Sequence, residues 1–225
     1  MPIENDSPHN KMLHINLEIE KKLECFILTQ MKFDGAHDID HIKRVVKNGI
    51  DLAQKEDGDL NIIIPACWLH DCVNVPKNSE QRSSGSLLSA NRAIEFLKDI
   101  KYPDKFLDDI HHAIHAHSFS ANIEANSLSA KIVQDADRLD ALGALGIARC
   151  LMYSANVNRP LYNSEDPFAK ERKLSDENNA IDHFFTKLKK LPETMKTASG
   201  KDLAFKRWSF MELYIEELKK EITRS

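Results

Sequence analysis

Apolar residues return every three or four positions along most of this chain, which is the spacing of one face of an α-helix. Alternation of β-branched and polar residues, the pattern of a half-buried strand, is rare, and the chain has only 7 glycines. We therefore predict an all-α fold of helices joined by short polar turns. A chain of 225 residues can bury one good core, and its length does not require a second domain.

The composition is that of an ordinary soluble globular protein, with 42% hydrophobic and 29% charged residues. A net charge of -4 gives no indication of a nucleic-acid-binding surface. The 4 cysteines are scattered without a Cys-x-x-Cys pair, which argues against a zinc knuckle and against a disulfide framework. No apolar run is long enough to span a membrane, and the polar N-terminal segment does not resemble a signal peptide. We expect a cytoplasmic protein with neither nucleic acid nor membrane as a partner.

The apolar periodicity predicts where the helices lie. The run Ile62-Ile63-Ile64 is the best strand candidate, but we favour a helix that starts near Pro65, because proline suits the first turn of a helix. Asp38 or Asp40 is expected to cap the helix predicted over about residues 41–54. The long polar segment 156–176 is interpreted as a surface excursion or lid. The other predicted helices span about residues 13–33, 41–54, 86–100, 103–117, 127–153 and 179–191, with a last one through 203–218.

The strongest indication of chemistry is an apolar run that ends in the doublet His70-Asp71. Histidine offers a borderline nitrogen and aspartate a hard oxygen, so the pair suits a divalent cation that also binds phosphate or water. A doublet alone occurs by chance in many chains. Its flanks make it more specific, because His41 lies upstream in the first turn of a predicted helix and Asp137 lies downstream in an acidic one. These four residues are the candidate metal ligands.

Three carboxylates occur within six positions of the predicted helix 127–153: Asp135, Asp137 and Asp140. Residues three apart share a helix face, so Asp137 and Asp140 can point together while Asp135 points roughly away. Like charges this close destabilise a helix unless a cation compensates them. A bound cation is the economical explanation, and Arg138 with exposure to solvent is the alternative.

Two further groups of residues are candidates for holding anionic oxygens. Lys77 and Arg82 lie in the polar loop 74–85 just after the doublet, although a solvated loop explains either residue equally well. Four of the 10 histidines fall between positions 111 and 117. We favour a functional role for His112 and His117, include His115 because it can share their cavity, and interpret His111 as part of a partly solvated helix end.

The order His41, His70-Asp71, Asp137 resembles the HD-domain superfamily of metal-dependent phosphohydrolases. Nearly the whole chain resembles a subgroup of small, mostly uncharacterised bacterial HD hydrolases. The motifs that carry this resemblance are His-Ile-Lys-Arg-Val, Trp-Leu-His-Asp, Ala-His-Ser-Phe-Ser and Ile-Val-Gln-Asp-Ala-Asp-Arg-Leu-Asp. The resemblance implies a helical bundle with one divalent cation held by those four residues. It also implies a single HD domain over 1–225, with a core at about 34–150 and a C-terminal helical extension at 176–225.

Members of this superfamily cleave phosphate esters or anhydrides, and some small relatives release pyrophosphate from nucleoside triphosphates. The resemblance therefore implies a small-molecule phosphate substrate, with a nucleotide as our leading choice. Mixed nitrogen and oxygen ligands favour manganese, magnesium, iron, cobalt or nickel over a closed structural zinc. Some binuclear members add two histidines between the doublet and the last aspartate, and His112 and His117 occupy that interval, so a second metal stays open.

One departure affects the expected mechanism. Several nucleotide-cleaving members carry a glutamate a few residues after the doublet, where this chain has Cys72, Val73, Asn74 and Val75. We expect Asp71 or Asp140 to act as the catalytic base, unless the cation alone lowers the pKa of the attacking water enough.

Three alternatives to a nucleotide pyrophosphohydrolase stay open: a phosphomonoesterase, a phosphodiesterase, and a non-catalytic module that senses a nucleotide. The chain is expected to be a monomer or a homodimer.

Overall fold

A computed structural model describes residues 15–30, 38–73, 75, 84–118 and 121–223. The predicted all-α fold is confirmed, since these residues form helices, turns and loops without a strand. Among the described helices, none combines the length and the apolar character needed to cross a membrane. The helices are α1 (Leu17–Gln30), α2 (Ile39–Glu56), α3 (Leu60–Leu69), α4 (Gly85–Asp99), α5 (Leu107–His117), α6 (Leu128–Leu139), α7 (Gly143–Asn156), α8 (Ala180–Thr186), α9 (Leu191–Thr194) and α10 (Ala198–Thr223), with 3-10 turns η2 (Asp104–Phe106) and η3 (Leu188–Lys190).

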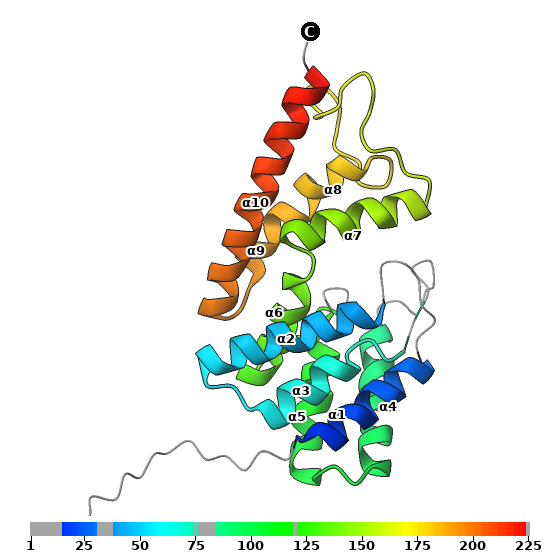
Figure 1. Ribbon diagram of the computed structural model, residues 1–225, viewed down its shortest axis with the longest axis vertical. Helices are drawn as coiled ribbons and strands as arrows, with labels where there is room; N and C mark the ends of the chain where they lie inside the picture. The colour runs from blue at the N-terminus through cyan, green and yellow to red at the C-terminus, as the bar shows by residue number, and fades with distance from the viewer. Residues whose placement is uncertain (1–14, 31–37, 74, 76–83, 119–120, 224–225) are drawn as a thin grey trace, which may run out of the picture.

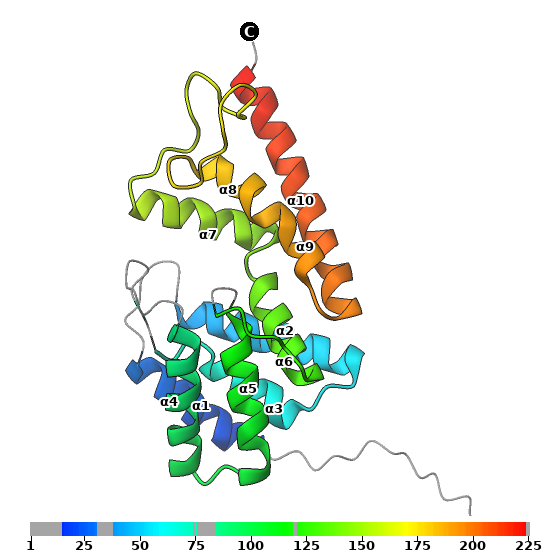
Figure 2. The ribbon, with the colours of Figure 1, turned by 180° about the vertical axis from the view of Figure 1, so that it is seen from behind.

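The helices form two groups along the long axis of the molecule (Figure 1). Helices α1 to α5 make one group, and α7 to α10 make the other. Helix α6 packs on α2, α3 and α5 and leads into the second group, as the view from behind also shows (Figure 2). Helix α10 in turn packs on α2, α6, α7 and α9, so the C-terminal helix contacts both groups. The division into a core at 34–150 and an extension at 176–225 stays a prediction.

Helix α3 is the centre of the first group, where it packs on α1, α2, α4, α5 and α6. Its residues from Asn61 to Leu69 are all buried, which explains why the segment is apolar on every side. The preference for a helix here is confirmed, but the helix starts at Leu60 rather than near Pro65. Asp59 caps it by accepting a hydrogen bond from the Asn61 amide at 2.9 Å.

Pro65 is tolerated inside α3 because another group satisfies the carbonyl that the proline leaves without its usual donor. Proline has no N–H, so the carbonyl of Asn61, four residues earlier, loses its normal helical partner. The hydroxyl of Tyr102 donates to that carbonyl at 2.7 Å. The helix can therefore continue to Leu69 and end at the His70-Asp71 doublet.

Helices α2 and α3 approach each other closely at Gly49. A Cβ atom at this position would lie 2.7 Å from Sγ of Cys67 and 3.2 Å from a methyl group of Ile63, so a larger residue would push the helices apart. The N-terminus of α2 is capped by Asp38, whose side chain accepts a hydrogen bond from the backbone amide of His41 at 2.7 Å. This packing brings His41 on α2 next to His70 at the end of α3.

The single helix predicted over residues 127–153 is wrong, because the chain breaks between Leu139 and Gly143 into α6 and α7. Gly143 has a φ of +77°, a left-handed conformation that favours glycine and cannot continue a helix. Arg207 of α10 packs against Gly143 and donates to the carbonyl of Leu139 at 2.5 Å. A tertiary contact from the far end of the chain thus stabilises a break that apolar periodicity did not reveal.

The predicted helix over 179–191 is also shorter than expected, because it divides into α8, η3 and α9. The polar segment 156–176, which precedes α8, contacts this helix through an ion pair. Arg172 donates to both carboxylate oxygens of the buried Asp182, at 2.5 and 2.8 Å, and the amide of Ser175 donates to the same side chain at 2.7 Å. These contacts fix the end of the segment on the second group of helices.

Asp135 links α6 to the start of α10. Its buried carboxylate accepts hydrogen bonds from the amides of Lys196 and Thr197 and from the Thr197 hydroxyl, at 2.7 to 3.1 Å. This side chain therefore points away from Asp137, as the helical spacing predicted. The same helix thus serves the C-terminal packing on one face and the candidate site on another.

Candidate metal centre

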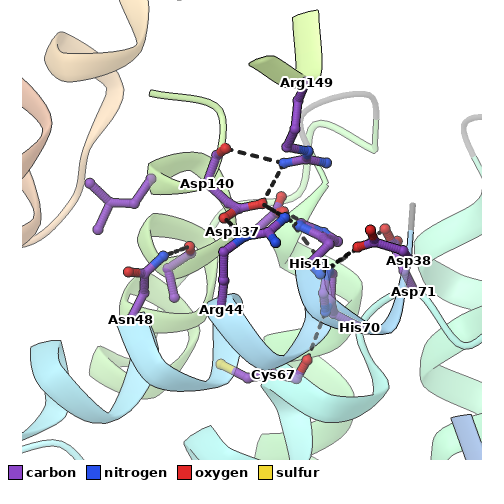
Figure 3. A network of polar contacts seen from close by, with 12 residues as sticks. Asp38, His41, Arg44, Asn48, Cys67, His70, Asp71, Asp137, Asp140 and Arg149 are labelled. Carbon is purple, nitrogen blue, oxygen red and sulfur yellow. Dashed lines mark hydrogen bonds and ion pairs between the residues drawn. The ribbon is translucent and has the colours of Figure 1, made fainter. Parts of the chain in front are cut away.

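The four predicted ligands converge from three helices (Figure 3). His41 lies in the first turn of α2, His70 and Asp71 follow the end of α3, and Asp137 lies on α6. Oδ1 of Asp137 is 3.6 Å from Nε2 of His41 and 3.8 Å from Nε2 of His70, and Oδ2 of Asp71 is 3.7 Å from Nε2 of His70. These distances are too long for hydrogen bonds. They suit donor atoms that share one ion at about 2.0 to 2.3 Å from each.

The chemistry of His70 fits a cation. The ring is fully buried, and its Nδ1 donates to the carbonyl of Cys67 at 2.8 Å, so Nε2 carries the lone pair. In the described part of the chain this Nε2 atom has no hydrogen-bond partner. Burial lowers the pKa of His70 below its usual value, which keeps the ring neutral. A buried lone pair aimed at two carboxylates is costly unless a ligand uses it.

His41 is held in the matching orientation by Asp140. Nδ1 of His41 lies 2.8 Å from Oδ2 of Asp140, and an ionised carboxylate only accepts, so Nδ1 carries the proton. The other ring nitrogen, Nε2, then presents its lone pair toward Asp137. Both histidines therefore offer Nε2 to the same space.

Asp140 is buried next to His41 and contacts two arginines (Figure 3). Arg44 donates through Nε at 2.7 Å and Nη2 at 3.1 Å, and Arg149 donates through Nη1 at 2.6 Å. Burial acts to raise the pKa of Asp140, but His41, Arg44 and Arg149 outweigh it and hold this pKa well below its usual range. The side chain is 1% exposed. This arrangement favours positioning of His41 over the role of general base that we expected for Asp140.

Asp71 differs from Asp140 in that its side chain is 42% exposed. Partial burial acts to raise the pKa of Asp71, but the neighbouring His70 and His117 outweigh it and hold this pKa well below its usual range. The carboxylate is therefore ionised and partly open to solvent. Both properties suit a metal ligand, and the catalytic role of Asp71 stays a prediction.

His117 joins the cluster from α5. Its buried ring lies 5.0 Å from that of His70, and its Nε2 is 3.4 Å from Oδ1 of Asp71. Nδ1 donates to the carbonyl of Ile114 at 2.6 Å, which fixes the ring. Burial acts to lower the pKa of His117, and the contact with Asp71 outweighs it and raises this pKa. The structure thus brings His117 to the same place as the four predicted ligands.

Among the described residues, His112 and His115 make contacts elsewhere. Nε2 of His112 accepts from the amide of Asn126 at 3.2 Å, and the ring of His115 lies 6.2 Å from that of His111. Lys77 and Arg82 lie outside the described residues. The roles of these four side chains stay predictions.

Sequence reasoning missed Arg44 and Arg149. One signal was available, since Arg44 is three residues after His41 and so shares its helix face. For Arg149 we find no comparable signal, because its contact with Asp140 depends on the break between α6 and α7. The contact of both arginines with one carboxylate is therefore visible only in the structure.

The HD-domain family model matches residues 38–142, a range that contains all four predicted ligands, and the chain belongs to this family. The uncharacterised protein YpgQ of Bacillus subtilis is 33% identical over 192 residues, covering 84% of this chain and 85% of YpgQ.

Solved structures agree with this assignment. The crystal structure of Bacillus subtilis YpgQ in complex with ADP matches with a TM-score of 0.71 and 30% identity, covering 90% of this chain and 97% of that one. An HD-superfamily hydrolase from Bacillus thuringiensis matches with a TM-score of 0.71 and 31% identity, covering 92% of this chain and 98% of that one. The fold is that of HD-superfamily hydrolases, and it supports metal-dependent phosphohydrolysis in general.

Proposed function

We propose that this protein hydrolyses a phosphoanhydride or phosphate ester of a nucleotide with the help of a divalent cation. The observation that carries the proposal is the convergence of His41, His70, Asp71 and Asp137 with both histidines presenting Nε2. The ADP in the crystal structure of the similar protein YpgQ supports a nucleotide as substrate. Release of pyrophosphate from a nucleoside triphosphate is our leading version of this reaction.

A divalent cation bound by these four residues would supply Lewis acidity toward a phosphate oxygen and toward the attacking water. Its identity is proposed from the donor set, which suits manganese, magnesium, iron, cobalt or nickel. Contacts within the protein orient the two histidines. Asp140 fixes the tautomer of His41, and the Cys67 carbonyl fixes that of His70.

Positive charge next to the site would hold the substrate. Arg44 and Arg149 contact Asp140, which in turn contacts His41, so two guanidinium groups lie beside the proposed ligands. Phosphate oxygens that extend from the cation toward α2 and α7 would gain from this charge. His117, held by Ile114 and next to Asp71, is the histidine best placed to contact a phosphate or a second cation.

Asp71 is our proposed base. Both carboxylates are ionised, but that of Asp71 is partly exposed and open to the attacking water, whereas that of Asp140 is enclosed by three donors. Cys72, one of the four positions at which the family resemblance would place a glutamate, is buried with its thiol directed at the Ser89 carbonyl, 3.3 Å away, and burial raises the pKa of this thiol to about 12. Cys72 therefore cannot take the place of that glutamate.

The test is a product screen with purified protein and each of the five metals. Nucleoside triphosphates, nucleoside monophosphates and cyclic nucleotides are offered, and orthophosphate, pyrophosphate and linear nucleotides are measured. Pyrophosphate from a triphosphate supports the leading proposal. Orthophosphate from a monophosphate would indicate a phosphomonoesterase, and a linear nucleotide would indicate a phosphodiesterase. Nucleotide binding without turnover in every metal would contradict the enzyme and favour a sensor.

A further inference from the structure

Helix α7 turns one face toward the candidate site and the opposite face toward the C-terminal helices. Arg149 reaches from α7 to Asp140, so its side of the helix looks into the site (Figure 3). On the other side, α7 packs on α8 and α10, and Ile147 and Ser154, which lie away from Arg149 around the helix, are buried. The helix is therefore fixed in its rotation about its own axis.

The face of α7 next to Arg149 is apolar and exposed. Leu145 lies four residues before Arg149 and Met152 three residues after it, so both flank it on the same side of the helix. Leu145 is 46% exposed and Met152 is 50% exposed. Ala148 and Ala155, also exposed, continue the surface with small side chains. We call Leu145, Ala148, Met152 and Ala155 the α7 stripe.

The charge of α7 distinguishes the α7 stripe from an ordinary exposed surface. The helix contains no acidic residue, and Arg149 is its only charged residue. Single exposed apolar residues need no explanation, but here two large ones flank a cation that points into the site. Ligand pockets combine apolar walls with a few polar groups that fix orientation, which is the combination that this face presents.

We propose that the α7 stripe binds the uncharged part of the substrate, the base and sugar of a nucleotide, while the phosphates lie beside Arg149 and the cation. This inference rests on the proposed function. Along the helix axis Leu145 lies about 6 Å before Arg149 and Met152 about 4.5 Å after it, so an apolar side chain lies within the length of a nucleoside on either side of the guanidinium. The flat ring of a base would cover the alkyl side chains, and the small Ala148 leaves it room to approach.

The experiment compares two ligands that differ only in the adenosine group and that cannot be hydrolysed between their phosphorus atoms. Binding of α,β-methylene-ADP and of methylenediphosphonate is measured by calorimetry with manganese. The proteins are the wild type, the double variant L145S/M152S, and the control F210S/L213S, which removes two exposed apolar residues from α10. Circular dichroism and sedimentation check the helical content and oligomeric state of each protein.

We expect the wild type to bind α,β-methylene-ADP more tightly than methylenediphosphonate. In L145S/M152S the affinity for the nucleotide should fall about tenfold, while that for the diphosphonate stays within about twofold. The control should bind both ligands like the wild type. Equal losses for the two ligands, no loss for the nucleotide, or a wild type that gains nothing from adenosine would overturn the inference. A change of oligomeric state in L145S/M152S would also overturn it, by assigning the stripe to a second copy of the chain.

The result is separate from the test of the proposed function. If the product screen detects no hydrolysis but the adenosine contribution disappears only in L145S/M152S, the enzyme proposal fails and the α7 stripe stands as a nucleotide-binding surface. If hydrolysis is detected and the adenosine contribution is unchanged, the enzyme stands and the stripe is refuted.

Discussion

Nδ1 of His41 lies 2.8 Å from Oδ2 of Asp140, although 99 residues separate them in the chain. The contact fixes the proton on one ring nitrogen and leaves Nε2 for the proposed cation. Arg44 and Arg149 hold the carboxylate in turn, so the orientation of a predicted metal ligand depends on α2, α6 and α7 together.

We predict that D140N weakens metal binding by about 10- to 100-fold, because an amide loses the charge that holds His41 and both arginines in place. Titration of the metal-free protein with manganese measures this. The control D202N changes an exposed carboxylate on α10 that pairs with Lys206, and it should bind manganese like the wild type. Equal affinities in D140N and D202N would contradict the positioning role of Asp140.

Removal of the His117 side chain should lower turnover more than it weakens binding of the first cation. We predict that H117A lowers kcat/KM by about 100-fold, as loss of a positioned charged or proton-donating group does, while the protein keeps its metal. The control H111Q alters a histidine of the same helix that contacts Asn91 and should leave kcat/KM unchanged. Loss of the metal in H117A would show instead that His117 is one of its ligands.

The close approach of α2 and α3 predicts a stability effect at Gly49. A Cβ there would lie 2.7 Å from Sγ of Cys67, so G49A should lower the free energy of unfolding by about 1 to 3 kcal/mol through overpacking. Urea unfolding measures the change. At Gly85 the nearest atom is 3.5 Å away, an ordinary contact, so G85A is the matched control. A G49A protein as stable as G85A would show that the two helices separate without cost.

The contacts of Asp182 predict that the free energy of unfolding depends on pH. Burial acts to raise the pKa of Asp182, but hydrogen bonds from Arg172 and Ser175 outweigh it and lower this pKa in the folded protein. A pKa below the unfolded value of about 3.9 stabilises the fold above that pH, and the stabilisation is lost as the pH falls toward the folded pKa. We expect D182N to be less stable than the wild type by about 1 to 3 kcal/mol at pH near 7.

The difference between D182N and the wild type should shrink as the pH falls from about 5 to about 3. Urea midpoints across this range measure it, with D104N, a change at an exposed residue of η2, as the control. A difference that stays constant with pH would show that the carboxylate contributes no ionisation-dependent stability.

The fold class and the convergence of the candidate ligands could be predicted from the sequence because each has a local signal. Apolar spacing indicated helices, and the doublet His70-Asp71 combined two ligand types at the end of an apolar run. Asp38 and Asp40 were both recognisable as cap candidates because each is an acid just before a helical pattern, and the structure selects Asp38.

What could not be predicted depends on contacts between distant segments. The break before Gly143 involves Arg207 of α10, and the start of α3 ahead of Pro65 depends on a hydroxyl from Tyr102. For Asp140, the contacts with distant segments were likewise not predictable. Its spacing from Asp137 suggested a shared cation, whereas the side chain is enclosed by Arg44 and Arg149.

The metal content of the purified protein tests the central claim most directly. Mass spectrometry of the wild type and of H70A, both checked for helical content and both loaded with manganese and then dialysed, gives the number of ions per chain. We predict about one ion per chain in the wild type and almost none in H70A, because the buried Nε2 of His70 is a ligand. Equal metal in both proteins, or a folded wild type that holds none, would contradict the account.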